Sequence, residues 1–471
     1  MQKLLPILLL ISFLSCKNKS GDEGPIIPPT VLPVQLWTTT ADQNNLLNKK
    51  TLAFANGRDD RFSTITIDTT VDLQPIEGFG YTMTGGSAQL LMQMGASERA
   101  ALLRQCFSSD STAIGVSYLR LSIGASDLDS KVFSYDDLPA GQTDPDLSEF
   151  SIAEDEKNLI PVLKEVLAIN PNVKLMGSPW SPPTWMKTNN SSKGGNLKPE
   201  YYGTYAQYFV KYIQAYQAHG ITIDAVTIQN EPHHGGNNPS MEMSSAQQAE
   251  FIKTTLGPAF QAANIATKII VWDHNCDEPN YPIEVMDDPA AKAFVHGAAF
   301  HMYGGDEGAL STVHDAHPDK ALYFTEQWTG KNGSFDGDLM WHIRHIIIGT
   351  MRNWSRVALE WNFANDPSFG PHTPGGCTEC RGAVTIDGNT AAKNVSYYII
   401  GQASKFVTPG SVRLTSNLTG TLPNVAFRRP DGKMVLIVLN EGTGLQSFNI
   451  QAGSRWITAS LLGKSAGTFV W

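Results

Sequence analysis

Two glutamates, Glu231 and Glu326, are the residues whose type and position most clearly predict chemistry. Glu231 lies in the segment IQNEP and Glu326 in the segment YFTEQ, so each ends a short apolar run that predicts a buried strand. A carboxylate at such a place is costly unless it faces a polar cleft. Two carboxyl groups that meet in one cleft can cleave a glycosidic bond. The pair therefore predicts the active site of an enzyme.

Short apolar segments alternate with segments of helical periodicity between about residue 76 and residue 405. The predicted strands are 76–80, 116–123, 173–178, 225–230, 268–273, 297–302, 321–326 and 356–361. The predicted helices are 97–107, 153–169, 199–219, 244–263, 337–353 and 391–405. This alternation predicts an α/β fold, a (β/α)8 TIM barrel with its active site at the C-terminal strand ends. An open doubly wound sheet is the alternative, but no glycine-rich dinucleotide fingerprint follows the first strand.

Both ends of the chain outside this region are rich in predicted β-strands. The segments 34–38, 51–55 and 64–70 precede the barrel, and 425–428, 434–439, 447–450 and 456–461 follow it. The sequence PDGK at 430–433 predicts a hairpin turn between two of them. We expect a catalytic barrel at 73–405 and a small all-β sandwich formed by 34–72 together with 406–471.

The composition indicates a globular protein with a large core. Of its 471 residues, 41% are hydrophobic and only 17% are charged. The net charge of −10 argues against a nucleic-acid partner. No motif for a cofactor is present, and we expect a monomer that acts on a small-molecule or polymeric substrate without one.

The first sixteen residues have the features of an export signal. Lys3 precedes an apolar run at 4–14, and Ser15-Cys16 follows. This ending resembles a bacterial lipoprotein signal, which implies that Cys16 becomes a lipidated first residue. Residues 17–33 are rich in glycine, proline, asparagine and serine, and we expect a flexible tether there. The prediction is an exported outer-membrane lipoprotein, at the cell surface or on the periplasmic face. Simple secretion is the alternative.

Four further cysteines remain, at positions 106, 276, 377 and 380. The Cys377-Thr378-Glu379-Cys380 spacing is compatible with a loop disulfide, a redox pair or half of a zinc site. A second CxxC or a histidine pair is missing, and no thioredoxin-like context surrounds the motif. A loop disulfide is therefore favoured, and we expect no metal site.

Polar or aromatic residues stand at nearly every predicted strand end. They are Arg120, Trp180, Asn230, Asp273, His274, His301, Tyr303 and Trp361, in addition to the two glutamates. Any one of them alone is more often a core or salt-bridged residue than a functional one. The glutamates differ because they end the fourth and seventh strands, on opposite sides of a barrel mouth.

Several stretches resemble glycoside hydrolase family 30, which contains glucosylceramidases, bacterial β-glycosidases and endo-β-1,6-glucanases. The resemblance covers nearly everything after about residue 34. The matching segments are GFGYTMT at 78–84, YLR at 118–120 through Asp127, SPWSPPTWMKT at 178–188, TIQNEP at 227–232, HMY at 301–303, TE at 325–326, EWN at 360–362, SKF at 404–406 and PGS at 409–411. The SPW segment is the most specific of these.

The resemblance implies separate roles for the two carboxyl groups. Glu231 matches the general acid and base, and Glu326 matches the nucleophile. Arg120 matches a residue that hydrogen-bonds the nucleophile and keeps it ionised. Asn230 matches a residue that holds the sugar 2-hydroxyl.

The resemblance also implies a set of residues around the sugar. Trp361 matches the aromatic floor beneath it, and Asp127 and Trp180 match residues that bind its outer hydroxyls. Tyr303 is expected to hydrogen-bond the nucleophile, with His301 in support. Taken alone, His301 and Trp180 are the two most easily read as core residues.

Two differences from the family concern the side of the site where the leaving group binds. Met302 stands where the animal members have tryptophan, and the loop 365–381 has no counterpart in the glucosylceramidases. Both differences argue against a ceramide-binding surface, and with it against a role in sphingolipid metabolism.

The resulting prediction is a retaining hydrolase of β-linked glucan, with the endo-β-1,6-glucanases as the nearest branch. It implies carboxyl groups about 5–5.5 Å apart. An exo-acting β-glucosidase or glucosylceramidase is the alternative, and a xylanase is disfavoured because Asp127 suggests a site for glucose. A catalytically inactive glycan-binding protein is a further alternative, although both carboxylates and Arg120 are present.

Overall fold

The computed structural model describes residues 33–471. The predicted export signal at 1–16, and the predicted tether apart from Pro33, lie outside the described residues. Among the described residues, no helix combines the length and the apolar character that crossing a membrane requires.

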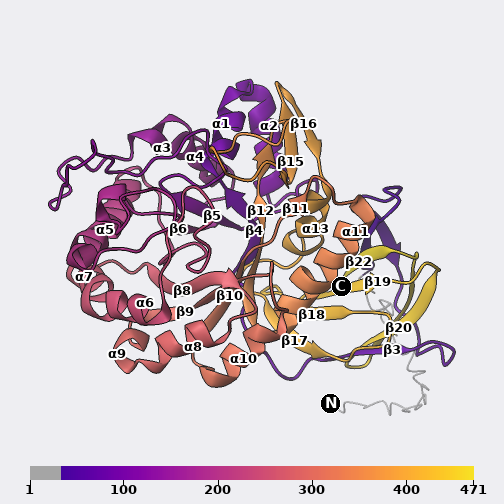
Figure 1. The fold of residues 1–471 in the computed structure, drawn as a ribbon. Helices are drawn as coiled ribbons and strands as arrows, with labels where there is room; N and C mark the ends of the chain where they lie inside the picture. Colours follow the sequence, from indigo (N-terminus) through magenta and orange to yellow (C-terminus); the bar gives the residue numbers. More distant parts are fainter. Residues whose placement is uncertain (1–32) are drawn as a thin grey trace, which may run out of the picture. The chain divides into compact units, whose positions relative to one another are not determined.

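Eight parallel strands close into a barrel, as the sequence predicts (Figure 1). In sequence order they are β4 (Gly78–Met83), β5 (Tyr118–Ile123), β6 (Lys174–Pro179), β7 (Ala225–Thr227), β8 (Lys268–Asn275), β9 (Val295–His301), β10 (Ala321–Glu326) and β12 (Ser355–Asn362). Neighbouring strands pair in this order around the barrel, and β12 closes the ring against β4. The fold class is therefore confirmed.

The barrel strands read as continuous apolar runs because both of their faces are buried. Every residue of β4, β5 and β10 is buried. Inside the barrel, side chains from most of the strands form a packed cluster that includes Tyr118, Met176, Ile270, Tyr323 and Leu359. The barrel is thus a filled core, and in this fold the active site lies at its C-terminal end.

Helices surround the barrel, most of them close to the predicted ranges. They are α1 (Gly85–Gln93), α2 (Ala96–Phe107), α3 (Ala153–Lys157), α4 (Leu159–Ile169), α5 (Tyr202–Ala218), α6 (Ser245–Phe251), α7 (Gly257–Ala262), α8 (Asn280–Asp287), α9 (Pro289–Lys292), α10 (Gly308–Ala316), α11 (Phe335–His342), α12 (Thr350–Arg352) and α13 (Val395–Ser404). Short 3-10 turns lie at Thr184–Met186 and Pro199–Tyr201, and π-helical turns at Ile252–Leu256 and Ile343–Gly349 join α6 to α7 and α11 to α12.

The predicted helix at 391–405 is wrong in its first residues. Residues Thr390–Lys393 form strand β16, which pairs with β15 (Val384–Asp387) across a two-residue turn. Gly388 in that turn has a φ of 58°, a conformation that favours glycine and suits a tight hairpin. Together with β13 (Ala364–Asn365), these strands form a small three-stranded sheet.

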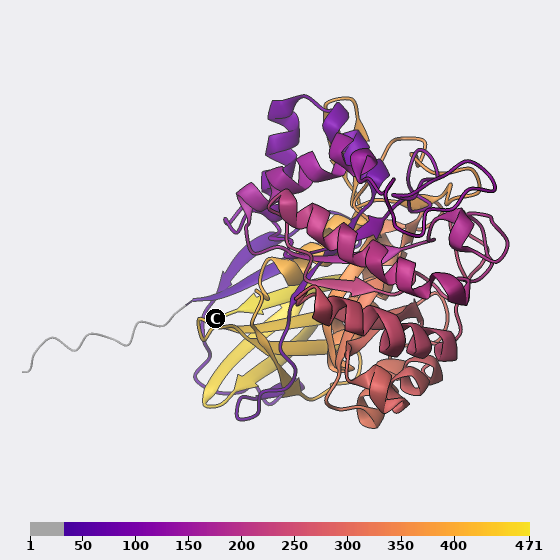
Figure 2. The same ribbon diagram turned by 90° about the vertical axis from the view of Figure 1, so that its left-hand side faces the viewer.

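The two ends of the chain build one β-sandwich, as expected. Its strands are β1 (Val34–Thr40), β2 (Asn48–Leu52), β3 (Thr64–Asp68), β17 (Val412–Ser416), β18 (Asn424–Arg428), β19 (Met434–Asn440), β20 (Gln446–Ala452), β21 (Arg455–Leu461) and β22 (Ser465–Val470). They form one nine-stranded array in which β1 pairs with β22 and β3 lies between β17 and β20, so strands from the two chain ends lie side by side (Figures 1 and 2). The hairpin predicted at 430–433 joins β18 to β19.

A two-stranded ribbon follows the seventh barrel strand. It pairs β11 (Thr329–Gly330) with β14 (Cys380–Arg381). Next to it, Cys377 and Cys380 form a disulfide, which confirms the predicted loop disulfide. Cys106 and Cys276 are buried free thiols.

Candidate active site

The barrel brings the two predicted glutamates together at its C-terminal end. Glu326 is the last residue of β10, and Glu231 follows β7, which ends at Thr227. A carboxylate oxygen of Glu231 and one of Glu326 lie within 4.8 Å of each other. Carboxyl groups about 5–5.5 Å apart are typical of retaining glycosidases, and about 6.5–9.5 Å is typical of inverting ones. The observed spacing therefore fits the retaining geometry.

The backbone at Glu231 is held in an unusual conformation. Its φ is 47°, and Trp272 and Asp273 on the neighbouring strand have φ values of 71° and 68°. The Glu231 N–H donates to the Asp273 carbonyl at 3.0 Å, and the Asn230 N–H donates to the Pro179 carbonyl at 2.8 Å. Such positions cost about 1–3 kcal/mol each and cluster at functional sites. Here the strain directs the Glu231 side chain into the barrel mouth.

Arg120 is the fully buried centre of the site. One guanidinium nitrogen, Nη1, donates to Glu326 Oε2 at 2.5 Å. The other, Nη2, donates to Asn230 Oδ1 at 2.5 Å, to Asp273 Oδ2 at 2.8 Å and to Ser178 Oγ at 3.1 Å. One cation therefore orients the predicted nucleophile and the predicted 2-hydroxyl ligand together.

The remaining polar contacts connect the two glutamates. The Tyr303 hydroxyl donates to Glu326 Oε1 at 3.1 Å. His301 is fully buried, with Nδ1 3.1 Å from Glu231 Oε1 and Nε2 3.1 Å from Asp273 Oδ1. The same Nδ1 lies 3.7 Å from Glu326 Oε1. His301 is therefore buried and also part of the site, between both carboxyl groups.

Asp273 is the main residue that the sequence did not assign to the site. Its Oδ1 accepts from Thr325 Oγ1 at 2.7 Å and its Oδ2 accepts from Thr227 Oγ1 at 2.8 Å, in addition to Arg120 and His301. Burial raises the pKa of Asp273, but the charge of Arg120, together with the hydrogen bonds and charge of His301 and the Ser178 hydroxyl, holds that pKa well below its usual range. The available signal was its place at the end of the fifth predicted strand.

The charges around the glutamates set where the site holds its proton. Burial raises the pKa of Glu326, and the charges of His301 and Arg120 only partly oppose this rise. Burial also raises the pKa of Glu231, but the hydrogen bond and the charge of His301, with smaller contributions from neighbouring histidines, together lower this pKa. Burial lowers the pKa of His301, but the charge of Glu326 and the bond to Asp273 raise it to about 9. The Glu231–His301 pair thus carries one proton at neutral pH.

The dependence of kcat/KM on pH should be bell-shaped. Activity requires an ionised Glu326, and because its pKa is raised, the acid limb should lie above the ordinary glutamate value of about 4.3. Activity also requires the proton of the Glu231–His301 pair, so the alkaline limb should lie near pH 9. Initial rates on an aryl β-glucoside measure both limbs.

A matched histidine variant tests this assignment. Burial lowers the pKa of His274 to about 4, and its Nε2 lies 3.9 Å from Glu231. His274→Asn should leave the alkaline limb in place, whereas His301→Asn should move it. An acid limb below pH 4, or an alkaline limb that stays at the same pH in His301→Asn, would contradict the assignment.

A cavity of about 300 Å³ lies over these groups. Seven of the predicted residues line it: Asp127, Trp180, Asn230, Glu231, Tyr303, Glu326 and Trp361. Arg120 and His301 lie beneath its floor, in contact with the glutamates. Residues that the prediction missed complete the wall, namely His234, Asn237, His274, Asn275, Trp328, Cys377 and Cys380. Four of them lie in loops, whereas His274 and Asn275 end strand β8 and Cys380 lies in β14.

Two tryptophans and one aspartate form the side of the cavity expected to receive the sugar. The rings of Trp180 and Trp361 lie 5.4 Å apart, and the Arg120 guanidinium lies 4.8 Å from the Trp180 ring. Asp127 Oδ2 accepts from the Cys377 N–H at 3.1 Å, and burial raises the pKa of Asp127 to about 7. The disulfide loop thereby holds the aspartate in position.

The glutamate pair together with His301 also has the spacing of metal ligands. Arg120 already supplies a positive charge 2.5 Å from Glu326. A second cation there would be repelled by the first. The arrangement therefore fits acid–base and nucleophilic chemistry of carboxyl groups.

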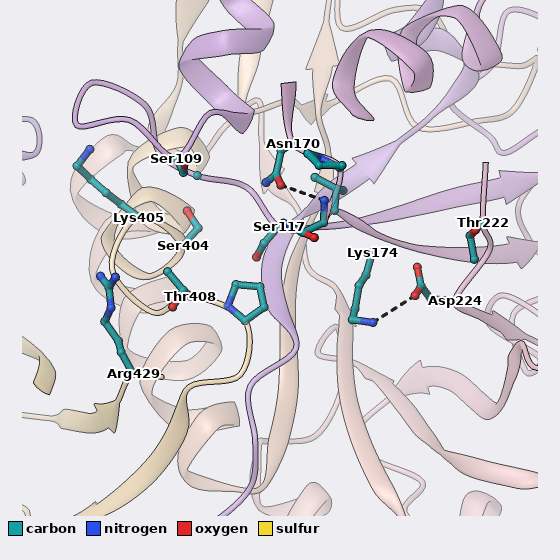
Figure 3. A pocket seen from close by; sticks show the side chains of 15 residues that line it. Ser109, Ser117, Asn170, Lys174, Thr222, Asp224, Ser404, Lys405, Thr408 and Arg429 are labelled. Carbon is teal, nitrogen blue, oxygen red and sulfur yellow. Dashed lines mark hydrogen bonds and ion pairs between the residues drawn. The ribbon is translucent and has the colours of Figure 1, made fainter. Parts of the chain in front are cut away.

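A larger hollow of about 750 Å³ lies at the opposite end of the barrel strands, next to the sandwich (Figure 3). Its cations are already bound: Lys174 Nζ pairs with Asp224 at 3.2 Å, and Lys405 Nζ donates to the carbonyls of Ser111 and Ala113. Residues at this end of a TIM barrel usually serve stability. None of the predicted site residues lines this hollow.

Comparison with known proteins places both parts of the chain in one family. Residues 76–407 match the glycosyl hydrolase family 30 TIM-barrel domain, and residues 410–469 match the family 30 beta sandwich domain. The chain is 35% identical to an endo-1,6-beta-D-glucanase of Neurospora crassa over 399 residues, covering 80% of this chain and 81% of that protein. It is 30% identical to the lysosomal acid glucosylceramidase of Mus musculus over 407 residues, covering 80% of this chain and 77% of that protein.

A comparison with solved structures agrees with this family. The structure of an endo-beta1,6-glucanase superposes with a TM-score of 0.87 at 35% identity, covering 93% of this chain and 99% of the other. The family match spans the barrel, the C-terminal strands of the sandwich and every predicted site residue. The chain therefore belongs to glycosyl hydrolase family 30 and is a retaining glycoside hydrolase.

Proposed function

We propose that this enzyme cleaves β-1,6-linked glucan within the chain, with retention of anomeric configuration. The observation that carries the chemistry is the pair Glu231 and Glu326 within 4.8 Å, with Arg120 bonded to one and His301 bonded to the other. The substrate rests on the relatives: the endo-1,6-beta-D-glucanases are 33–35% identical, whereas the glucosylceramidases are 29–30% identical.

The reaction proceeds in two displacements. In the first, Glu326 attacks the anomeric carbon, the glycosidic bond breaks, and the Glu231–His301 pair gives its proton to the departing oxygen. Arg120 and Tyr303 orient Glu326 for this attack, because they bond its two oxygens. In the second, Glu231 takes a proton from water, the water oxygen attacks the anomeric carbon, and the bond to Glu326 breaks.

The products formed at early times test the substrate and the endo action. On linear β-1,6-glucan, the enzyme should first release oligosaccharides of several lengths, measured by chromatography. An NMR time course should show the β-anomer first. A parallel screen of β-1,3- and β-1,4-glucans, aryl glucosides and aryl xylosides tests the linkage.

The main alternative is an exo-acting β-glucosidase or a glucosylceramidase, since lysosomal acid glucosylceramidase is among the relatives. Early release of glucose alone from β-1,6-glucan would favour it and contradict the endo proposal. Met302, where the animal members have tryptophan, weighs against it. An inactive glycan-binding protein would bind glucan in this screen without any product.

The proposed location is the outer membrane, through a lipid anchor at Cys16. The support is the sequence of the first sixteen residues alone. Cys16→Ser should move the protein from the membrane fraction to the soluble fraction of the producing bacterium. Unchanged fractionation would contradict the anchor.

A further inference from the structure

A second hollow lies directly beside the reaction site. It has a volume of about 360 Å³, and we call it the outer groove. Its side chains include Gln327, Trp328, Asn332, Asp338, Trp341 and Glu379. Trp328 lines both the outer groove and the cavity above the glutamates. Trp328 is the one lining residue that the two hollows share.

The outer groove presents an aromatic surface to solvent. Among the exposed large hydrophobic side chains of residues 33–471, only two are aromatic: Tyr303 at 42% exposure and Trp341 at 37%. Tyr303 belongs to the reaction site, and Trp341 belongs to the outer groove. An exposed indole has a flat apolar face, which suits the C–H face of a pyranose ring.

The Trp341 ring is held in a fixed position. It packs on His345 at 4.9 Å and on His342 at 5.0 Å, measured between ring centroids. Each histidine is itself anchored: His342 Nδ1 lies 2.7 Å from Glu360, and His345 Nδ1 lies 3.0 Å from Glu307. A platform that is already rigid loses little conformational entropy when a ligand binds.

The opposite wall of the groove is equally constrained. The ribbon of β11 and β14 joins the segment after Trp328 to the disulfide loop. The Lys331 N–H donates to the Glu379 carbonyl at 2.8 Å, and Glu379 lies between the bonded Cys377 and Cys380. The disulfide therefore fixes the edge of this groove as well as the wall of the reaction site.

The polar groups of the groove suit a neutral sugar. Asp338 and Glu379 are acidic, and no lysine or arginine is among the lining residues. Carboxylates accept hydrogen bonds from hydroxyl groups but repel anionic ligands.

We propose that the outer groove is a second glucose-binding subsite, which binds another unit of the same glucan chain with Trp341 as its stacking platform. This inference rests on the proposed function, because only a polymeric substrate spans both hollows. In this proposal Trp341 determines how strongly the enzyme prefers long glucan chains, and it takes no part in the chemical step.

The test compares Trp341→Ala with Trp456→Ala. Trp456 is a partly exposed tryptophan on strand β21 of the sandwich. The kcat/KM of each variant is measured on the linear β-1,6-glucan polymer and on 4-nitrophenyl β-glucoside. Trp341→Ala should lower kcat/KM by about tenfold more on the polymer than on the aryl glucoside. The loss should come mainly from a higher KM, as expected when one stacking contact is removed. Trp456→Ala should show no such difference.

Binding gives a second measurement that does not depend on turnover. In a Glu326→Gln background, affinity electrophoresis in gels containing β-1,6-glucan should show weaker retardation when Trp341 is replaced. Equal losses on both substrates with equal retardation would overturn the subsite. If the wild-type enzyme prefers another β-glucan, the proposed linkage is wrong. Comparing Trp341→Ala with Trp456→Ala on that glucan then still tests whether the outer groove is a subsite. A wild-type enzyme active only on the aryl glucoside contradicts both.

Discussion

Glu326→Gln should reduce kcat on every glycoside substrate by at least about 10⁴-fold, because loss of a nucleophile removes the covalent route itself. The amide keeps the shape of the side chain but cannot attack the anomeric carbon. Its oxygen can still accept the hydrogen bond from Arg120 Nη1. The variant should therefore fold and bind glucan, which circular dichroism and affinity electrophoresis check.

Glu360→Gln is the matched control for this prediction. Glu360 is a buried carboxylate on the neighbouring barrel strand β12, but it pairs with His342 at 2.7 Å and does not line the reaction cavity. Its replacement should lower stability and leave the activity of the folded fraction on 4-nitrophenyl β-glucoside, a substrate too short to reach Trp341, within a few-fold of the wild type. If Glu326→Gln kept more than one per cent of wild-type turnover, the nucleophile would have to be another residue.

Arg120→Met should lower the free energy of unfolding by about 3–5 kcal/mol, because it removes the cation between two buried carboxylates. Asp273 and Glu326 both bond to Arg120, and each would remain without that partner. Catalytic activity should fall with it, since Glu326 loses the group that orients it. Urea unfolding monitored by tryptophan fluorescence measures the stability change.

The pH dependence of the free energy of unfolding distinguishes loss of the Arg120 charge from simple loss of packing. The lowered pKa of Asp273 contributes stability above the ordinary aspartate pKa of about 3.9, and this contribution is lost as the pH falls through the folded value. The stability gap between Arg120→Met and wild type should therefore narrow on acidification.

Arg413→Met supplies the comparison. Arg413 is a buried arginine that bonds Gln74 and has no carboxylate partner among the described residues. Its replacement should cost a similar amount above and below about pH 3.9. A gap for Arg120→Met that does not narrow as the pH falls below about 3.9 would contradict the charge-based account.

The barrel was predictable from the sequence because its strands are buried on both faces and read as continuous apolar runs. The strand predicted at 321–326 matches β10 at every position. Strand β22, with the sequence SAGTFV, was not predicted because small and polar residues weaken its apolar pattern. Its burial comes from neighbours that are distant in sequence, and this cannot be seen locally.

The site was predictable where a residue type at a strand end implies its role, as for Glu231, Glu326 and Arg120. Asp273 could not be assigned in this way, because its importance lies in five contacts made by residues of other strands. Trp328 lies in the loop after the seventh strand, where the sequence has no periodic pattern. Trp341 lies within the predicted helix 337–353 and on α11, but helical periodicity alone does not show that its side chain lines a groove beside the site.

The joining of the two chain ends in the sandwich has a consequence for the order of events during synthesis. Strand β1 is made first, but Gln35 pairs with Val470, near the last residue of the chain. A contact of such sequence separation forms late, because the whole barrel must be synthesised between the two partners. Strand β1 can pair with β2 early, but its other edge stays open until β22 has been made, so the sandwich is completed only after the barrel sequence has been synthesised.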